Sequence, residues 1–110
     1  MGGMELTQYA IVLVNLDPTI GSEIKKTRPC VIISPDEMNR HLQTIVLAPM
    51  TTNTKAYPTR VAVEMNSTKG MVVLDQIRTV DRSRLLKVIG QLNSNEIKNC
   101  KAVIKETYVD

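Results

Sequence analysis

A chain of 110 residues with 43% hydrophobic and 23% charged residues has the composition of a single soluble globular domain. Its longest apolar run, Tyr9 to Val14, is too short to span a bilayer, and no basic segment precedes an apolar stretch at the start, so we expect a cytoplasmic protein without a membrane partner. The net charge of +3 is compatible with a polyanionic partner but does not by itself indicate one.

Short apolar segments separated by turn residues indicate a β-rich fold. Polar loops at residues 17–27 and 51–58 and turns at 36–41 and 66–70 divide the chain, and the 36–41 segment is either a polar turn or a single helical turn. The apolar and β-branched runs between them predict strands at residues 9–16, 29–33, 44–50, 59–64, 71–74 (with an extension toward 79) and 88–89.

The C-terminal segment changes to a helical period. Ser94 is a suitable N-cap, Glu96 falls in the first turn, and apolar residues recur at three- and four-residue intervals up to Tyr108. This pattern predicts an amphipathic helix of roughly 12 residues. The expected fold class is therefore mainly β, a small antiparallel barrel closed by a C-terminal α-helix, in one domain over residues 1–110 with a flexible N-terminal segment at 1–7.

Familiar catalytic signatures are absent from the sequence. Cys30 and Cys100 lie far apart with no paired Cys or His spacing, so we expect two buried thiols, not a zinc site or a disulfide. The single histidine, His41, is expected to face solvent in its turn. The chain has no Phe and no Trp, which disfavours the sheet-type RNA readers that stack bases on aromatic side chains. We expect no metal and no cofactor.

Three segments of the sequence nevertheless match a known family pattern in their order and spacing. They are Asn15-Leu16-Asp17-Pro18-Thr19 with Gly21-Ser22-Glu23 and Arg28-Pro29; Ala48-Pro49-Met50-Thr51-Thr52 with Tyr57-Pro58; and Leu74-Asp75-Gln76-Ile77-Arg78-Thr79-Val80-Asp81 with Ser83-Arg84-Leu85. In this order and at this spacing the chain resembles the MazF/PemK/Kid family of toxin–antitoxin ribonucleases, over about residues 8 to 107.

The resemblance implies both a fold and an activity. The fold is a homodimer of Src-homology-3-like barrels with appended helices. The activity is a metal-independent mRNA interferase, an endoribonuclease that cuts single-stranded RNA at a short sequence and leaves a 2′,3′-cyclic phosphate and a 5′-hydroxyl. A cognate antitoxin with a MazE-like acidic segment is the implied inhibitor.

The resemblance also implies which residues react. Arg28 suits the extra negative charge of a phosphorane transition state, because guanidinium donates parallel hydrogen bonds to phosphate oxygens. Thr51 is the second catalytic candidate, although its hydroxyl also suits a backbone cap at Thr52 or Asn53. Glu23 and Asp75 are further candidates, and the general base stays open among them, a backbone or water relay and the phosphate itself. The residues expected to bind RNA are Ser22, Lys25, Lys26, Thr52, Gln76 and Arg78.

Two other readings remain. CcdB-type toxins are similar in fold, act on DNA gyrase by binding and have no catalytic activity, but they use a C-terminus ending in aromatic and small residues. This chain ends Glu106-Thr107-Tyr108-Val109-Asp110 and has no tryptophan, which counts against that mode. The other reading is a catalytically inactive family member.

Overall fold

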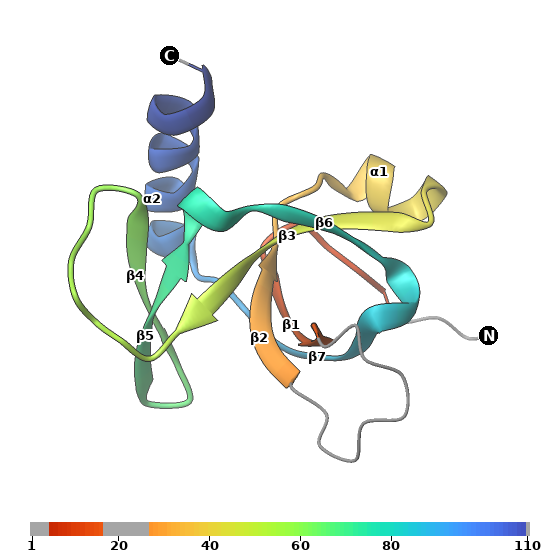
Figure 1. Ribbon diagram of the computed structural model, residues 1–110, viewed down its shortest axis with the longest axis horizontal. Helices are drawn as coiled ribbons and strands as arrows, with labels where there is room; N and C mark the ends of the chain where they lie inside the picture. The colour runs from red at the N-terminus through yellow and green to blue at the C-terminus, as the bar shows by residue number, and fades with distance from the viewer. Residues whose placement is uncertain (1–4, 17–26, 110) are drawn as a thin grey trace.

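The computed structural model describes residues 5–16 and 27–109, which form a curled antiparallel sheet with a helix along one side (Figure 1). Neighbouring strands follow the order β4-β5-β3-β2-β1-β7, and β6 pairs with β3 outside that path. The strands are β1 (Ala10–Asn15), β2 (Thr27–Ile32), β3 (Thr44–Thr51), β4 (Arg60–Met65), β5 (Thr68–Val73), β6 (Arg78–Asp81) and β7 (Leu85–Gln91); the helices are α1 (Asp36–His41), α2 (Ser94–Ile104), the 3₁₀ turns η1 (Leu74–Gln76) and η2 (Arg82–Arg84), and the π-helical turn η3 (Lys105–Val109).

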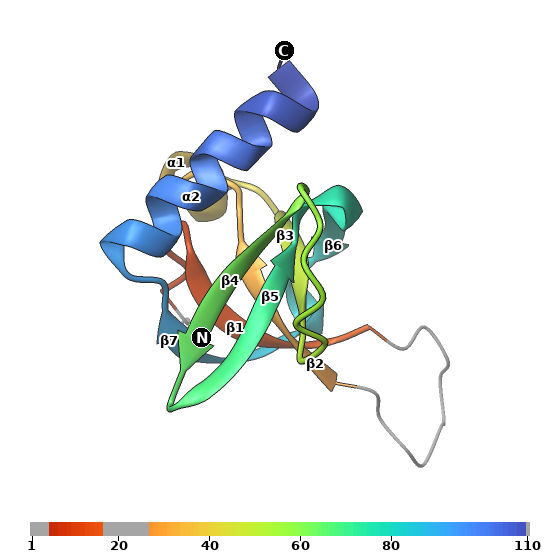
Figure 2. The same ribbon diagram turned by 90° about the vertical axis from the view of Figure 1, so that its left-hand side faces the viewer.

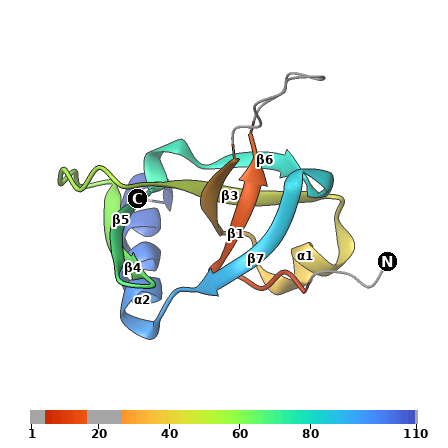
Figure 3. The same ribbon diagram turned by 90° about the horizontal axis from the view of Figure 1, so that it is seen from below.

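Strand β3 connects the two parts of the sheet. Its first half pairs with β6, where Ile45 lies opposite Val80, and its last two residues pair with β5, where Met50 lies opposite Val72. Figure 3 shows β3 running from the curled part of the sheet, beside β6, to the β4–β5 hairpin. Two register irregularities between β1 and β7 sharpen the curl. The ends of β2 and β3 therefore lie next to the hairpin.

The core has two parts. One fills the inside of the curl with side chains such as Val12, Ile32 and Leu47, and Leu6 packs with them, so packing begins inside the N-terminal segment that was expected to be flexible. The other lies between the sheet and α2, which crosses the hairpin side of the molecule (Figure 2). Cys30 and Cys100 are both fully buried free thiols, one in each part, as predicted.

Most strand positions were predicted correctly, but three boundaries were wrong. The expected turn at 66–70 is only Asn66-Ser67, both at positive φ (51° and 66°), so β5 begins at Thr68; two such residues suffice for a tight hairpin. The expected extension from 71 to 79 is interrupted by η1, which leaves β6 as a separate strand. Strand β7 extends well beyond residues 88–89 because its backbone pairs with β1 along its length.

The helices follow the predicted pattern with one correction. The N-cap of α2 is Asn93, not Ser94: its side chain accepts a hydrogen bond from the Glu96 amide at 2.8 Å, and the Glu96 carboxylate accepts one from the Asn93 amide at 2.9 Å. In α1, His41 is exposed and lies 3.2 Å from Glu37, as expected of a surface residue. Neither α1 nor α2, within the part of the chain described, has the length and apolar character needed to cross a membrane.

Candidate functional site

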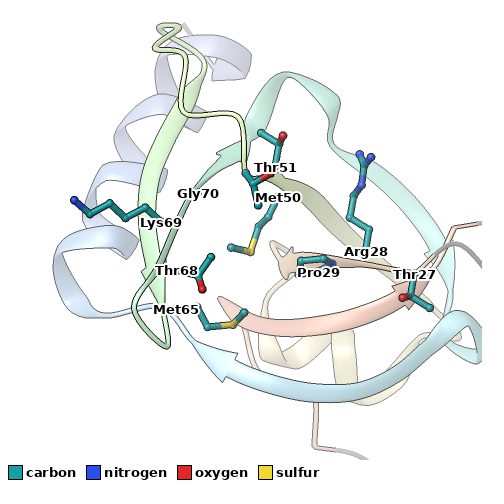
Figure 4. A pocket seen from close by; sticks show the side chains of 10 residues that line it. Thr27, Arg28, Pro29, Met50, Thr51, Met65, Thr68, Lys69 and Gly70 are labelled. Atoms are coloured by element: carbon teal, nitrogen blue, oxygen red, sulfur yellow. The ribbon is translucent and has the colours of Figure 1, made fainter.

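A pocket of about 270 Å³ lies where the ends of β2 and β3 meet the β4–β5 hairpin (Figure 4). It brings together Arg28 from β2, Thr51 from the end of β3 and Thr52 just after it, three residues that were expected to take part in catalysis or RNA binding. The remaining lining residues are Thr27, Pro29, Met50, Met65, Thr68, Lys69 and Gly70.

The register of β2 against β3 explains why Arg28 and Thr51 meet. The last paired positions are Cys30 and Pro49, in an antiparallel arrangement. Arg28 and Thr51 each lie two residues beyond this pair along their strands, where β3 turns to pair with β5, and this equal spacing puts them on the same face. Figure 4 shows both side chains rising to the same side, while the Met50 side chain points the other way. Distant sequence segments thus present a cation and a hydroxyl to one space.

The Thr51 hydroxyl already has a backbone partner. Its oxygen accepts a hydrogen bond from the Asn53 amide at 3.2 Å, which is the capping role considered as an alternative to catalysis. The bond orients the hydroxyl and leaves its proton able to donate to a bound group. Capping and catalysis are therefore compatible at this residue.

Strand β5 approaches the Thr51 backbone closely at Gly70. A Cβ added there would lie 2.8 Å from the Thr51 carbonyl oxygen, closer than real Cβ atoms come to other atoms. Only glycine permits this approach without a shift of the backbone. Gly70 therefore helps to fix the position of Thr51, a role that sequence reasoning did not identify.

Two guanidinium groups lie near the buried thiol of Cys30. Burial raises the pKa of Cys30 to about 12, and the positive charges of Arg28 and Arg78 act in the opposite direction. Arg78 comes from β6, where it pairs with Leu47, and both arginines are exposed. The Cys30 thiol also donates a weak hydrogen bond to the Arg28 carbonyl at 3.6 Å. Arg28 and Arg78 thus create a positive region at this end of the curl.

The other predicted site residues divide into two groups. Asp75 and Gln76 lie in η1 and do not line the pocket; the Asp75 carboxylate accepts a hydrogen bond from the Thr59 hydroxyl at 2.9 Å. The second group lies outside the described residues and consists of Ser22, Glu23, Lys25 and Lys26. Within residues 5–16 and 27–109, no three His, Cys, Asp or Glu side chains gather in a way that could hold a metal ion.

The hairpin residues of the pocket were missed by sequence reasoning. These residues, Met65, Thr68 and Lys69, flank the Asn66-Ser67 turn. Their sequence pattern is that of an ordinary hairpin and gives no sign of a functional site. They reach the pocket because β5 pairs with the end of β3, a contact between distant segments that no local pattern reports. Met50 belongs to one of the three recognised segments. Its position next to Thr51 in the sequence was the only sign that it could line the site.

Comparisons with known proteins point to one family. A family model described as "PemK-like, MazF-like toxin of type II toxin-antitoxin system" matches residues 7–108. The protein named Endoribonuclease MazF from Staphylococcus saprophyticus is 33% identical over 100 residues, which cover 86% of this chain and 83% of that protein.

Solved structures show the same fold. The crystal structure of MazF (Form-I) from Deinococcus radiodurans has a TM-score of 0.81 at 22% identity and covers 98% of this chain and 100% of its own. MazE-MazF (Form-II) from the same organism has a TM-score of 0.80 at 22% identity, over 94% of this chain and 96% of its own. The predicted fold class, mainly β with a small antiparallel barrel and a C-terminal helix, is confirmed, with the barrel formed by the curled antiparallel sheet. The chain belongs to the PemK-like, MazF-like family of toxins of type II toxin–antitoxin systems.

Proposed function

We propose that this chain is a sequence-specific endoribonuclease toxin that cleaves single-stranded mRNA without a metal ion. The observation that carries the proposal is the shared pocket of Arg28 and Thr51, in a chain related to a protein named Endoribonuclease MazF. An arginine beside a hydroxyl donor suits phosphoryl chemistry, because the charge on the transition state is met by donors already in position.

The reaction is an internal transfer within the RNA. The ribose 2′-oxygen attacks the adjacent phosphorus and loses its proton, while the bond from phosphorus to the 5′-oxygen breaks and that oxygen gains a proton. The products are a 2′,3′-cyclic phosphate and a 5′-hydroxyl. The Arg28 guanidinium binds the non-bridging phosphate oxygens as they gain charge, and the Thr51 hydroxyl donates to one of them.

The proton acceptor is not assigned to either carboxylate. Asp75 is hydrogen-bonded to Thr59 and lies outside the pocket lining, which favours a structural role for it. Glu23 lies outside the described residues. The acceptor therefore stays open among Glu23, a backbone or water relay and a phosphate oxygen.

The partners follow from the family. The solved relatives include a MazE-MazF structure and an endoribonuclease in complex with its cognate antitoxin, which supports an antitoxin partner for this chain. An acidic antitoxin segment would compete with RNA for the positive region formed by Arg28 and Arg78. We propose further that the protein is a homodimer and acts in the cytoplasm, where its mRNA substrate lies.

Primer extension on a long single-stranded RNA, in excess EDTA, tests this function. The expected result is cutting at one short sequence, with a cyclic phosphate at the upstream end and a 5′-hydroxyl at the downstream end. DNA gyrase supercoiling is measured with the same protein. Intact RNA together with inhibited gyrase would instead support a non-enzymatic toxin, and intact RNA with active gyrase would support an inactive family member.

Thr51 variants separate its two roles. Thr51→Ser keeps the hydroxyl and should retain most activity, whereas Thr51→Val removes it and should slow single-turnover cleavage by about 10-fold or more. Both variants keep the β-strand position, and urea unfolding reports any loss of stability. Equal rates for the two variants would remove the Thr51 hydroxyl from the mechanism.

A further inference from the structure

The part of the pocket next to Arg28 and Thr51 is mostly apolar and has two methionine walls. Met50 comes from the end of β3, and Met65 closes β4. In Figure 4 the side chains of Met50, Met65 and Thr68 face one another across the space, while the Lys69 side chain points away from it. Pro29 and Gly70 complete the lining. The result is an apolar recess with one hydroxyl, continuous with the proposed reaction site.

The size of this recess suits a small planar group. The whole pocket measures about 270 Å³, below the ~300–1,000 Å³ usual for sites that hold drug-sized ligands. A space of this size is enough for one heterocyclic ring system beside a phosphate bound at Arg28. Gly70 also lines the pocket, and any side chain there would meet the Thr51 backbone.

The lining also suits a nucleobase in its chemistry. Sequence-specific readers of single-stranded RNA hold unstacked bases between flat or polarizable side chains and hydrogen-bond to their edges. This chain has no Phe and no Trp but six Met, and thioether sulfur makes favourable contacts with aromatic rings. Methionines can therefore take the place that aromatic side chains occupy in other RNA-binding proteins.

We propose that this recess is a specificity subsite that binds one unstacked nucleobase next to the cleaved phosphate. Met50 and Met65 contact the faces of the ring, and the Thr68 hydroxyl hydrogen-bonds to its edge. The subsite rests on the proposed ribonuclease function, because its ligand is the substrate RNA. It assigns sequence selection to the β4–β5 hairpin, which the three recognised sequence segments do not include.

The first test removes the Thr68 hydroxyl. Thr68 is exposed at the start of β5, so Thr68→Val preserves the strand and should fold normally. Cleavage rates are measured on RNAs that carry each of the four bases at the two positions flanking the cut. The preference at one position should fall by about 10-fold, as expected for one hydrogen bond between uncharged groups. Thr44→Val, an exposed threonine at the other end of β3, is the matched control and should leave the preference unchanged.

The second test combines base removal with pocket filling. An abasic nucleotide at the position sensitive to Thr68 should slow the wild-type protein by about 10-fold or more. Met65→Trp fills the recess, so this variant should already be slow on the normal RNA and should lose little more on the abasic RNA. Met65→Leu conserves volume and should still respond to the abasic site.

The outcomes separate the subsite from the function. If the wild-type protein cuts RNA but Thr68→Val leaves every base preference unchanged, the subsite is overturned and the ribonuclease stands. The subsite is also overturned if base removal slows Met65→Trp as much as it slows the wild-type protein. It is overturned as well if Met65→Trp changes only the oligomeric mass, because that result would indicate that a second protein chain covers this surface. If the wild-type protein cuts no RNA under any condition, the proposed function itself fails.

Discussion

Gly70→Ala tests how the sheet positions the proposed active site. The new Cβ would lie 2.8 Å from the Thr51 carbonyl oxygen. The Cβ is fixed to its own backbone and the oxygen belongs to the backbone of a paired strand, so neither can turn aside as a side-chain tip would. The end of β3 must therefore shift away from β5. Overpacking of this kind costs about 1–3 kcal/mol of unfolding free energy.

The same substitution should also slow catalysis. Thr51 would be displaced relative to Arg28, and a displacement of about 1 Å in a reacting group can cost about 10²-fold in rate. We expect Gly70→Ala to remain folded at 25 °C and to show a strongly reduced single-turnover rate. Urea unfolding and RNA cleavage, measured on the same preparation, separate the two quantities.

Gly90→Ala is the matched control for this prediction. Its Cβ would lie 3.4 Å from Ile11 Cδ1 and from Met65 Sδ, an ordinary van der Waals separation, so the strand should accept it with little cost. The reasoning is refuted if Gly70→Ala keeps wild-type stability and rate, or if Gly90→Ala is impaired to the same degree.

Three further predictions concern stability. Asn93→Ala removes the N-cap of α2 and should lower the unfolding free energy by about 1 kcal/mol in urea titration, with Asn95→Ala, one position inside the helix start, as the neutral comparison. Tyr108→Phe removes a 2.6 Å hydrogen bond to the Leu74 carbonyl and should speed hydrogen exchange in the last turn of the chain without changing exchange in the sheet. Burial holds the pKa of Cys30 and Cys100 at about 12, above the ordinary 9.0, so their contribution to stability is complete below pH 9 and is lost as the pH rises toward 12. Replacing both cysteines by Ala should therefore make the fall in unfolding free energy between pH 9 and 12 less steep. An unchanged slope would contradict this prediction.

Local patterns predicted the strands well because each carries its own apolar signal. The runs at β1, β2 and β3 lie almost where they were expected, and the change to a helical period marked α2 within one residue of its start. The errors arose where the backbone preference of a short segment competes with its pairing to a strand that is distant in the sequence. The turn at Asn66-Ser67 is shorter than expected. Positive φ at two non-glycine residues is costly in isolation and is accepted here for the pairing of β4 with β5.

The candidate site was predictable only in part. Arg28 and Thr51 were proposed from the family resemblance, and their meeting in one pocket depends on the β2–β3 register, which two strand patterns alone do not determine. Gly70, Met65 and Thr68 could not be predicted, because their proximity to Thr51 exists only once β5 pairs with the end of β3. Residues from the hairpin thus enter the site through tertiary structure alone.

The central claim is that the Arg28 guanidinium stabilises the transition state of RNA cleavage. The most direct measurement is the single-turnover cleavage rate, in EDTA, of Arg28→Ala and of Arg40→Ala, whose exposed arginine in α1 pairs only at the surface with Glu37 among the residues described. We expect Arg28→Ala to be slower than the wild-type protein by about 10²-fold or more with its fold and oligomeric mass unchanged, and Arg40→Ala to be unaffected. An Arg28→Ala protein that cuts at nearly the wild-type rate would contradict the account.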